Sequence, residues 1–86
     1  MNKQSVTVYT KNWCGDCHRT KRFLDDYAIS YSEIDVETKP EFRSTVRALN
    51  GGHESVPVVV FDDGSTLTEP SDAALAAKLN ITVDEW

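Results

Sequence analysis

The sequence predicts an α/β fold, in which one four-stranded mixed sheet is flanked by three helices in the order βαβαββα. Four short stretches are rich in β-branched residues or alternate polar and apolar side chains, and three further stretches repeat apolar side chains at helical spacing. A strand–helix–strand unit, followed by a hairpin and a covering helix, joins such segments into one sheet. The chain has 86 residues, which is enough for a single hydrophobic core. We expect one domain over residues 1–80 and a loosely held acidic tail over residues 81–86.

The first half of the chain predicts a strand, a helix and a second strand. Residues 5–10 alternate polar and apolar side chains and are rich in β-branched residues, which favours a strand. Residues 15–28 contain no proline and repeat apolar side chains at helical spacing, so we expect a helix with Cys14 at its start. Residues 31–36 alternate again and predict the second strand, with one irregularity in the pattern.

A second helix is predicted after this strand. Thr38 is a candidate N-cap, and Pro40 lies in the first turn. Apolar residues then recur on one helix face, at Phe42, Val46 and Leu49. We expect the helix to end at residues 50–52, which include two glycines.

The last third of the chain predicts a hairpin and a final helix. Residues 56–61 are apolar enough for a strand that is covered on both faces, and residues 66–68 return beside it after a turn. Ser71 or Asp72 then caps an alanine-rich helix, whose leucines we expect to point inward. Asn80 closes this helix.

Charge and hydropathy exclude two classes of function. The net charge is −5, and the charges are unevenly distributed along the chain. The part up to Arg47 contains eight basic and seven acidic residues, whereas the part after it contains one basic residue, Lys78, and seven acidic ones. Nucleic-acid binding needs a basic face, so we expect no nucleic-acid partner. The longest uncharged apolar stretch, residues 55–61, is far shorter than the roughly 20 residues of a membrane span. Residues 1–5 lead into no signal-type apolar segment, so we expect a cytoplasmic protein with no membrane partner.

Cys14 and Cys17 are the only cysteines, and they form a Cys-Gly-Asp-Cys motif. Small secreted proteins that depend on disulfides usually have four or more cysteines that close longer loops, so this pair indicates chemistry rather than a scaffold. A Cys-x-x-Cys motif between a strand and a helix is typical of thioredoxin-like redox proteins.

The position of the motif at a helix start gives its two cysteines different roles. Unpaired backbone N–H groups and the helix dipole favour a thiolate on Cys14, which we expect to be exposed and to act as the nucleophile. Cys17 lies one turn inside the helix. From there it attacks a mixed disulfide formed on Cys14 and releases the reduced partner.

Other interpretations of the motif remain open. A zinc half-site would need about four ligands, and only His18 and His53 are available besides the cysteines, so we expect no metal. Cys14 to His18 also match the attachment pattern of c-type haem, although a strand precedes the motif and no methionine follows Met1. A third alternative is that both cysteines are inert core residues.

Several residues around the cysteines are candidates for substrate contact. Lys11 lies three residues before Cys14, where its charge either stabilises the thiolate or meets an anionic group of a substrate. Trp13 is either a flat platform for a substrate or a cover for the sheet edge. Asp16 disfavours a second negative charge nearby. The other cations of this helix are interpreted as a solvated face: Arg19, Lys21 and Arg22.

The chain resembles a known family in several stretches. Residues 9–17, followed later by Ser55-Val56-Pro57, resemble the glutaredoxin branch of the thioredoxin superfamily. Within that branch, residues 49–52 and 61–71 look most like the mycoredoxins of actinobacteria. The resemblance implies a thioredoxin/glutaredoxin-like fold and a thiol–disulfide oxidoreductase. It also implies a redox-active disulfide that serves electron transport and cell redox homeostasis.

The resemblance further implies a mechanism and a substrate groove. Cys14 attacks a mixed disulfide between a protein and a small thiol such as mycothiol, and either a second thiol or Cys17 regenerates it. The Val56–Pro57 bond is then cis and lies beside Cys14, with the backbone of Val56 pairing to the bound thiol. Lys11, Ser71 and Asp72 match the region where glutaredoxins hold the ends of glutathione.

The resemblance also implies the reaction partners. We expect no bound cofactor, a low-molecular-weight thiol (mycothiol or glutathione) as co-substrate, oxidised or S-thiolated proteins as partners, and a monomer. Asp16 stands where the family commonly has an aromatic residue, and residues 68–72 lack the Gly-Gly turn of glutathione-type glutaredoxins. The alternative is a redoxin that a flavin-dependent thioredoxin reductase reduces, and that passes electrons to ribonucleotide reductase or to peroxidases.

Overall fold

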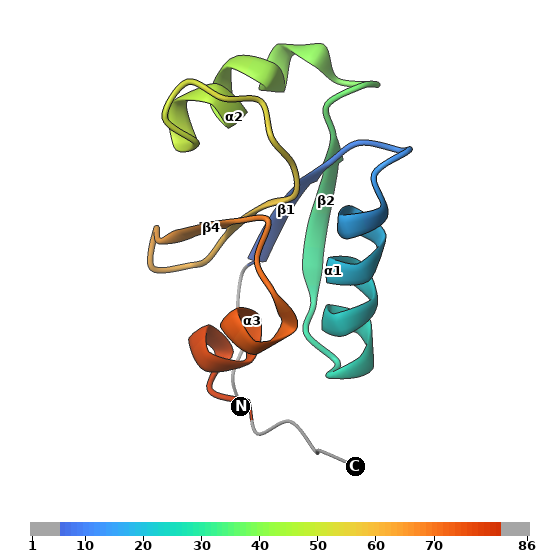
Figure 1. Ribbon diagram of the computed structural model, residues 1–86, viewed down its shortest axis with the longest axis vertical. Helices are drawn as coiled ribbons and strands as arrows, with labels where there is room; N and C mark the ends of the chain where they lie inside the picture. The colour runs from blue at the N-terminus through green and yellow to red at the C-terminus, as the bar shows by residue number, and fades with distance from the viewer. Residues whose placement is uncertain (1–5, 82–86) are drawn as a thin grey trace.

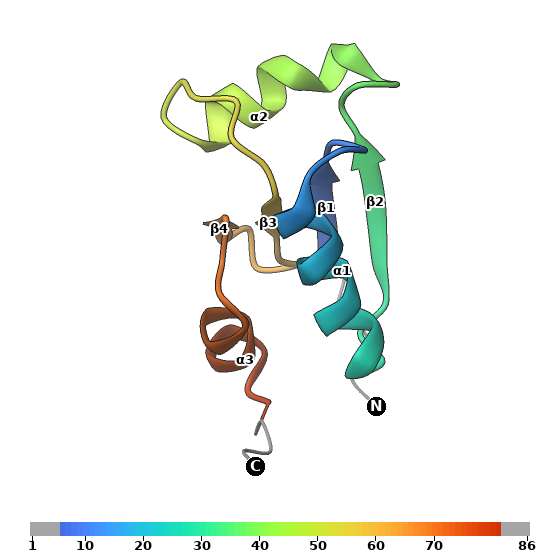
Figure 2. The ribbon, with the colours of Figure 1, turned by 45° about the vertical axis from the view of Figure 1, so that its right-hand side comes forward.

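A four-stranded mixed sheet forms the centre of the protein. The computed structural model describes residues 6–81 of the chain. The strands are β1 (Val6–Thr10), β2 (Tyr31–Asp35), β3 (Val58–Val60) and β4 (Thr66–Thr68). Their order across the sheet is β2-β1-β3-β4, and β1 runs parallel to β2 and antiparallel to β3 (Figures 1 and 2). The predicted fold class is confirmed.

Three α-helices and one short 3₁₀ helix connect and cover the strands. They are α1 (Gly15–Asp26), the 3₁₀ helix η1 (Pro40–Phe42), α2 (Arg43–Leu49) and α3 (Asp72–Leu79). The predicted ends of the last helix are confirmed: the Ser71 hydroxyl accepts from the backbone N–H of Ala74 at 3.1 Å, and Asn80 ends the helix in the left-handed conformation, with φ of 57°.

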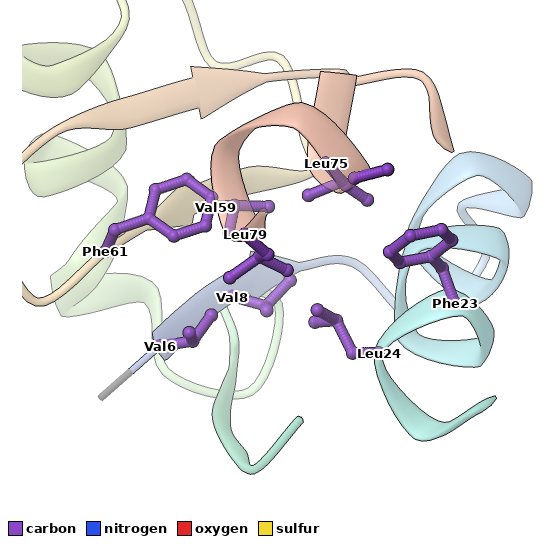
Figure 3. Close-up of a cluster of buried hydrophobic side chains, with 9 residues drawn as sticks. Val6, Val8, Phe23, Leu24, Val59, Phe61, Leu75 and Leu79 are labelled. Carbon is purple, nitrogen blue, oxygen red and sulfur yellow. The ribbon is translucent and has the colours of Figure 1, made fainter. Parts of the chain in front are cut away.

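The helices divide between the two faces of the sheet (Figure 2). Alternate residues of a strand point to opposite faces, so Val8 and Tyr9 belong to different clusters. The larger cluster joins α1 and α3 to β1 and β3, and Figure 3 shows most of its side chains: Val6, Val8, Phe23, Leu24, Val59, Phe61, Leu75, Ala76 and Leu79. The smaller cluster lies under α2: Tyr9, Val36, Val46 and Val58. The larger cluster therefore anchors α1 against β1 through Phe23 and Leu24, and the two cysteines lie at the other end of this helix.

Two predicted element starts are wrong. The Thr38 hydroxyl donates to the carbonyl of Asp35 at 3.1 Å and caps no helix. The residue before the first turn is instead Lys39, which supplies no side-chain cap. The strand predicted from residue 56 begins at Val58, because Pro57 has no backbone N–H to donate to a neighbouring strand.

Ile81, the first residue of the predicted C-terminal tail, contacts the rest of the fold. The backbone N–H of Ile81 donates to the carbonyl of Ala76 at 2.8 Å, and its side chain packs against the larger cluster. The remainder of the predicted tail, residues 82–86, and the predicted first strand residue, Ser5, lie outside the described residues. Within residues 6–81, no helix has the length and apolar character that crossing a membrane requires.

Candidate active site

The sulfur of Cys14 lies at the start of α1. Cys14 has extended backbone angles and is the N-cap of the helix, and its Sγ accepts a hydrogen bond from the backbone N–H of Cys17 at 3.1 Å. A sulfur in this place takes the role that a serine or aspartate oxygen has in most helix caps. A donated N–H and the positive end of the helix dipole both favour a negative charge on this sulfur.

The fold brings Val56 to the same sulfur from 42 residues along the chain. As a thiol, Cys14 Sγ donates to the carbonyl oxygen of Val56 at 3.7 Å. The Val56–Pro57 peptide bond is cis, and the Pro57 side chain is fully buried. The cis bond therefore follows the residue whose carbonyl lies beside Cys14, an arrangement that the family resemblance implied.

Cys14 is less exposed than the sequence predicted. Only 9% of its surface is open to solvent, because its sulfur lies between the start of α1 and the loop that carries Val56. The neighbouring Trp13 is 71% exposed, so it does not cover the sheet edge. A substrate of Cys14 would therefore have to meet the small exposed part of this residue, the Cys14 opening, next to the exposed indole ring of the preceding residue.

Cys17 is completely buried, and this sets its chemistry. Burial, followed by the hydrogen bond with Cys14, raises the pKa of the Cys17 thiol from its ordinary 9.0 to about 12, although the backbone N–H of Lys11 acts in the opposite direction. Cys17 is accordingly a neutral thiol at neutral pH.

The predicted substrate residues lie in two places. Near the sulfur, the Lys11 ammonium lies over the Trp13 ring, 5.4 Å from its centroid. At the start of α3, the Ser71 hydroxyl caps the helix, and the Asp72 carboxylate accepts from Arg19 of α1 at 2.7 Å. Arg19 also donates to the carbonyl of Pro70 at 3.0 Å, which ties the start of α3 to the cysteine helix.

A polar network on the Cys17 side of α1 was not predicted from the sequence. The Lys21 side chain, predicted to be solvated, is only 20% exposed, and its Nζ lies 2.8 Å from Oε2 of Glu33 on β2. The hydroxyl of Thr10, which is 1% exposed, donates to the same oxygen at 2.8 Å. Lys21 follows Cys17 by four residues, so helical spacing alone placed the two on one face. Of the other two cations, Arg22 is exposed and Arg19 is paired as described.

The described part of the chain offers few ligands for a metal. Residues 6–81 hold no group of three or more histidine, cysteine, aspartate or glutamate side chains placed to bind an ion. His18 and His53 are both exposed. Nε2 of His18 lies 3.1 Å from the carbonyl oxygen of Asn12, which accepts its hydrogen.

Comparison with known proteins gives consistent matches. The family model described as Glutaredoxin matches residues 6–65. A Mycobacterium tuberculosis protein named "Putative glutaredoxin" is 45% identical over 75 residues, which cover 87% of this chain and 89% of the relative. Mycoredoxin 1 of Corynebacterium glutamicum is 35% identical over 75 residues, covering 87% of this chain and 92% of its own. The glutaredoxin-like protein NrdH of Escherichia coli is 36% identical over 58 residues, covering 67% of this chain and 69% of its own.

Solved structures agree with the sequence relatives. The crystal structure of a glutaredoxin from Archaeoglobus fulgidus superposes with a TM-score of 0.75 at 25% identity, covering 86% of this chain and 84% of that one. The NrdH-redoxin of Escherichia coli, whose thioredoxin-like activity profile was the subject of its structure, has a TM-score of 0.66 at 33% identity, covering 74% and 80%.

Proposed function

The chain belongs to the glutaredoxin family of thiol–disulfide oxidoreductases, and we propose that it reduces mixed disulfides between proteins and a small thiol, with mycothiol as that thiol. The observation that carries the proposal is the contrast between the two cysteines. Cys14 has its sulfur at a helix N-terminus with a donated N–H, whereas Cys17 is a buried neutral thiol. One sulfur is prepared to attack, and the other is held in reserve one helical turn away.

The proposed reaction starts at Cys14. Its thiolate attacks the small-thiol sulfur of a mixed disulfide, the S–S bond to the protein breaks, and the protein thiolate leaves and takes up a proton. The small thiol is then bound to Cys14 through a new disulfide. In one route a second small thiol attacks the sulfur of the bound small thiol, which gives the small-thiol disulfide and free Cys14. In the other route Cys17 attacks the Cys14 sulfur, which gives the Cys14–Cys17 disulfide and releases the small thiol. Both routes conserve electrons, because each step exchanges one disulfide for another.

The proposed groove consists of residues around the Cys14 opening. Trp13 offers a flat exposed face, and Lys11 adds a positive charge above it. The Val56 carbonyl already points at the Cys14 sulfur, which supports a pairing between the Val56 backbone and the bound thiol, with Pro57 fixing that loop. Ser71 and Asp72, by contrast, already have partners, so we propose that they border the groove.

Mycothiol is favoured over glutathione by three observations. Mycoredoxin 1 is similar over 87% of this chain. The Asp72 carboxylate is already paired with Arg19, and residues 68–72 carry no Gly-Gly turn. Mycothiol has sugar groups where glutathione has peptide ends, so its binding does not depend on residues 68–72 in the same way. We further propose a cytoplasmic monomer whose protein partners are oxidised or S-thiolated proteins.

A second candidate is a redoxin that takes electrons directly from a flavin-dependent thioredoxin reductase. Its support is the similarity to NrdH proteins, at 36% identity over 58 residues for that of Escherichia coli. In this candidate the Cys14–Cys17 disulfide is the form that the reductase reduces. The electrons then pass to an enzyme such as ribonucleotide reductase or a peroxidase.

One assay tests both candidates. The purified protein is given mycothiol, glutathione or thioredoxin reductase as the only electron source, and turnover of a mixed disulfide substrate is measured. The main proposal expects fastest turnover with mycothiol, loss of activity in Cys14→Ser, and retained activity in Cys17→Ser. Turnover with the reductase alone supports the redoxin instead. Undiminished activity of Cys14→Ser contradicts both.

A further inference from the structure

The route through Cys17 places a charge in a buried part of the protein. Cys17 is 0% exposed, yet it must become a thiolate to attack the mixed disulfide on Cys14. A buried thiolate is costly unless a nearby positive charge or hydrogen bonds stabilise it. The protein must therefore provide such groups around this sulfur.

Lys21 is placed to provide the positive charge. It follows Cys17 by one helical turn on α1, so the two side chains lie on the same face of the helix. Its side chain is only 20% exposed, and its Nζ is held 2.8 Å from Glu33. The hydroxyl of Thr10, at the end of β1, donates to the same carboxylate. The next residue, Lys11, directs its backbone N–H toward Cys17. The ammonium is thus fixed on the helix face that carries the buried thiol.

We propose that Lys21, held in place by Glu33, is a positioning residue for the resolving step: its ammonium stabilises the Cys17 thiolate that attacks the Cys14 mixed disulfide. This inference rests on the proposed function, and specifically on its two-cysteine route. The charge of Lys21 lowers the pKa of Cys17 and so works against the effect of burial. The other groups that affect the pKa of Cys17 are the Cys14 sulfur and the backbone N–H of Lys11. Glu33 in turn raises the pKa of Lys21, and His18 lowers the pKa of Glu33.

The step balances without any further reagent. Cys17 gives its proton to solvent, and its thiolate attacks Sγ of Cys14. The bond between Cys14 and the small thiol breaks as the Cys14–Cys17 disulfide forms. The small thiol leaves as a thiolate and takes a proton from solvent. The mixed disulfide is the oxidant, and Cys17 is oxidised as the small thiol is reduced.

The test separates the two steps with the neutral disulfide dithiodipyridine. Attack by Cys14 on this probe releases a first pyridinethione, and resolution by Cys17 releases a second, so stopped-flow absorbance shows two phases. We expect Lys21→Met to slow the second phase about threefold to tenfold at neutral pH and to move its pH midpoint upward, with the first phase unchanged. Lys21→Arg keeps the charge and is expected to restore the second phase.

Arg22→Met is the matched control, because it removes an exposed charge one residue further along the same helix. The inference is overturned if the second phase has the same rate and the same pH midpoint in Lys21→Met as in the wild type. Equal slowing in Lys21→Met and Arg22→Met also overturns it, since general helix charge would then explain the effect. Lys21→Gln is measured in parallel, and urea unfolding shows that the variants are folded. A first phase that persists in Cys14→Ser contradicts the proposed function instead.

Discussion

The backbone N–H of Cys17 donates a hydrogen bond to the sulfur of Cys14 at 3.1 Å, so Cys17 supports the proposed nucleophile with its backbone while its own thiol is buried. The arrangement depends on a helix that starts at the first cysteine, because only there is the N–H three residues on free of an intrahelical partner. The same turn buries Cys17 completely. A single local structure therefore separates the reactivities of two chemically identical side chains.

This separation predicts selective alkylation. Treatment of the reduced protein with iodoacetamide at neutral pH is expected to modify Cys14 and leave Cys17 free, because burial raises the pKa of Cys17 to about 12 and shields it from the reagent. Peptide mass spectrometry locates the adduct. Cys14→Ser should remain unlabelled until urea is added. Modification of both cysteines at similar rates in the folded protein contradicts the assignment of roles.

The raised pKa of Cys17 also predicts how stability depends on pH. In the unfolded chain this thiol loses its proton near its ordinary pKa of 9.0, whereas in the folded protein it keeps the proton until about 12. The folded state therefore binds more protons in this window, and the free energy of unfolding falls as pH rises. The expected slope from this group is about 1.4 kcal/mol per pH unit.

Urea unfolding of the reduced protein at several alkaline pH values measures that slope. Lysines and tyrosines titrate in the same range, so the comparison is with Cys17→Ala, which lacks only this thiol. The difference in stability between the two proteins should shrink as pH rises. A difference that is independent of pH would show that Cys17 ionises as easily in the folded protein as in the unfolded chain.

The parts of the fold that depend on local pattern could be predicted from the sequence. Alternation predicted β1 and β2, and Ser71 and Asn80 marked both ends of α3, because caps act within a few residues of the helix. The start of the second helix could not be predicted in this way. Thr38 is a good capping residue, but its hydroxyl bonds back to Asp35, and nothing in the local sequence distinguishes these two uses.

In the candidate site too, features set by local sequence could be predicted, whereas features set by long-range packing could not. The proposed roles of Cys14 and Cys17 follow from a spacing of three residues at a helix start. The position of Val56 beside Cys14 came only from family resemblance, since it depends on chain pairing across 42 residues. The pairing of Lys21 with Glu33 depends on how α1 packs over β2, and hydropathy patterns contain no information about such an ion pair. The low exposure of Cys14 was missed for the same reason.

Trp13 offers a test that separates substrate contact from folding. Its side chain is 71% exposed, so Trp13→Ala is expected to change the free energy of unfolding by no more than about 0.5 kcal/mol. The same substitution should lower kcat/KM for a protein–mycothiol mixed disulfide about threefold to tenfold, because the indole face beside the Cys14 opening is lost. Trp13→Phe keeps a flat ring and should retain most of the activity. Unchanged kcat/KM in Trp13→Ala would remove this residue from the groove.

Glu33 predicts an effect at the acidic end of the pH range. The hydrogen bond from Lys21, and then that from Thr10, hold the pKa of the Glu33 carboxyl below its ordinary 4.5. Because the folded-state pKa is the lower one, the carboxylate stabilises the protein above pH 4.5, and this contribution is lost as pH falls through the folded-state pKa. The carboxylate is 38% exposed, so screening by solvent keeps the contribution below about 1 kcal/mol.

Glu33→Gln should therefore be less stable than the wild type near neutral pH, and the difference should diminish on acidification. Urea unfolding curves across the acidic range provide both values. Glu41→Gln removes an exposed carboxylate outside this network and shows what the loss of one negative charge does by itself. If Glu33→Gln matches the wild type in stability at neutral pH, the carboxylate does not hold Lys21 strongly. The ammonium would then have to be fixed beside Cys17 by the packing of its own methylene chain along α1.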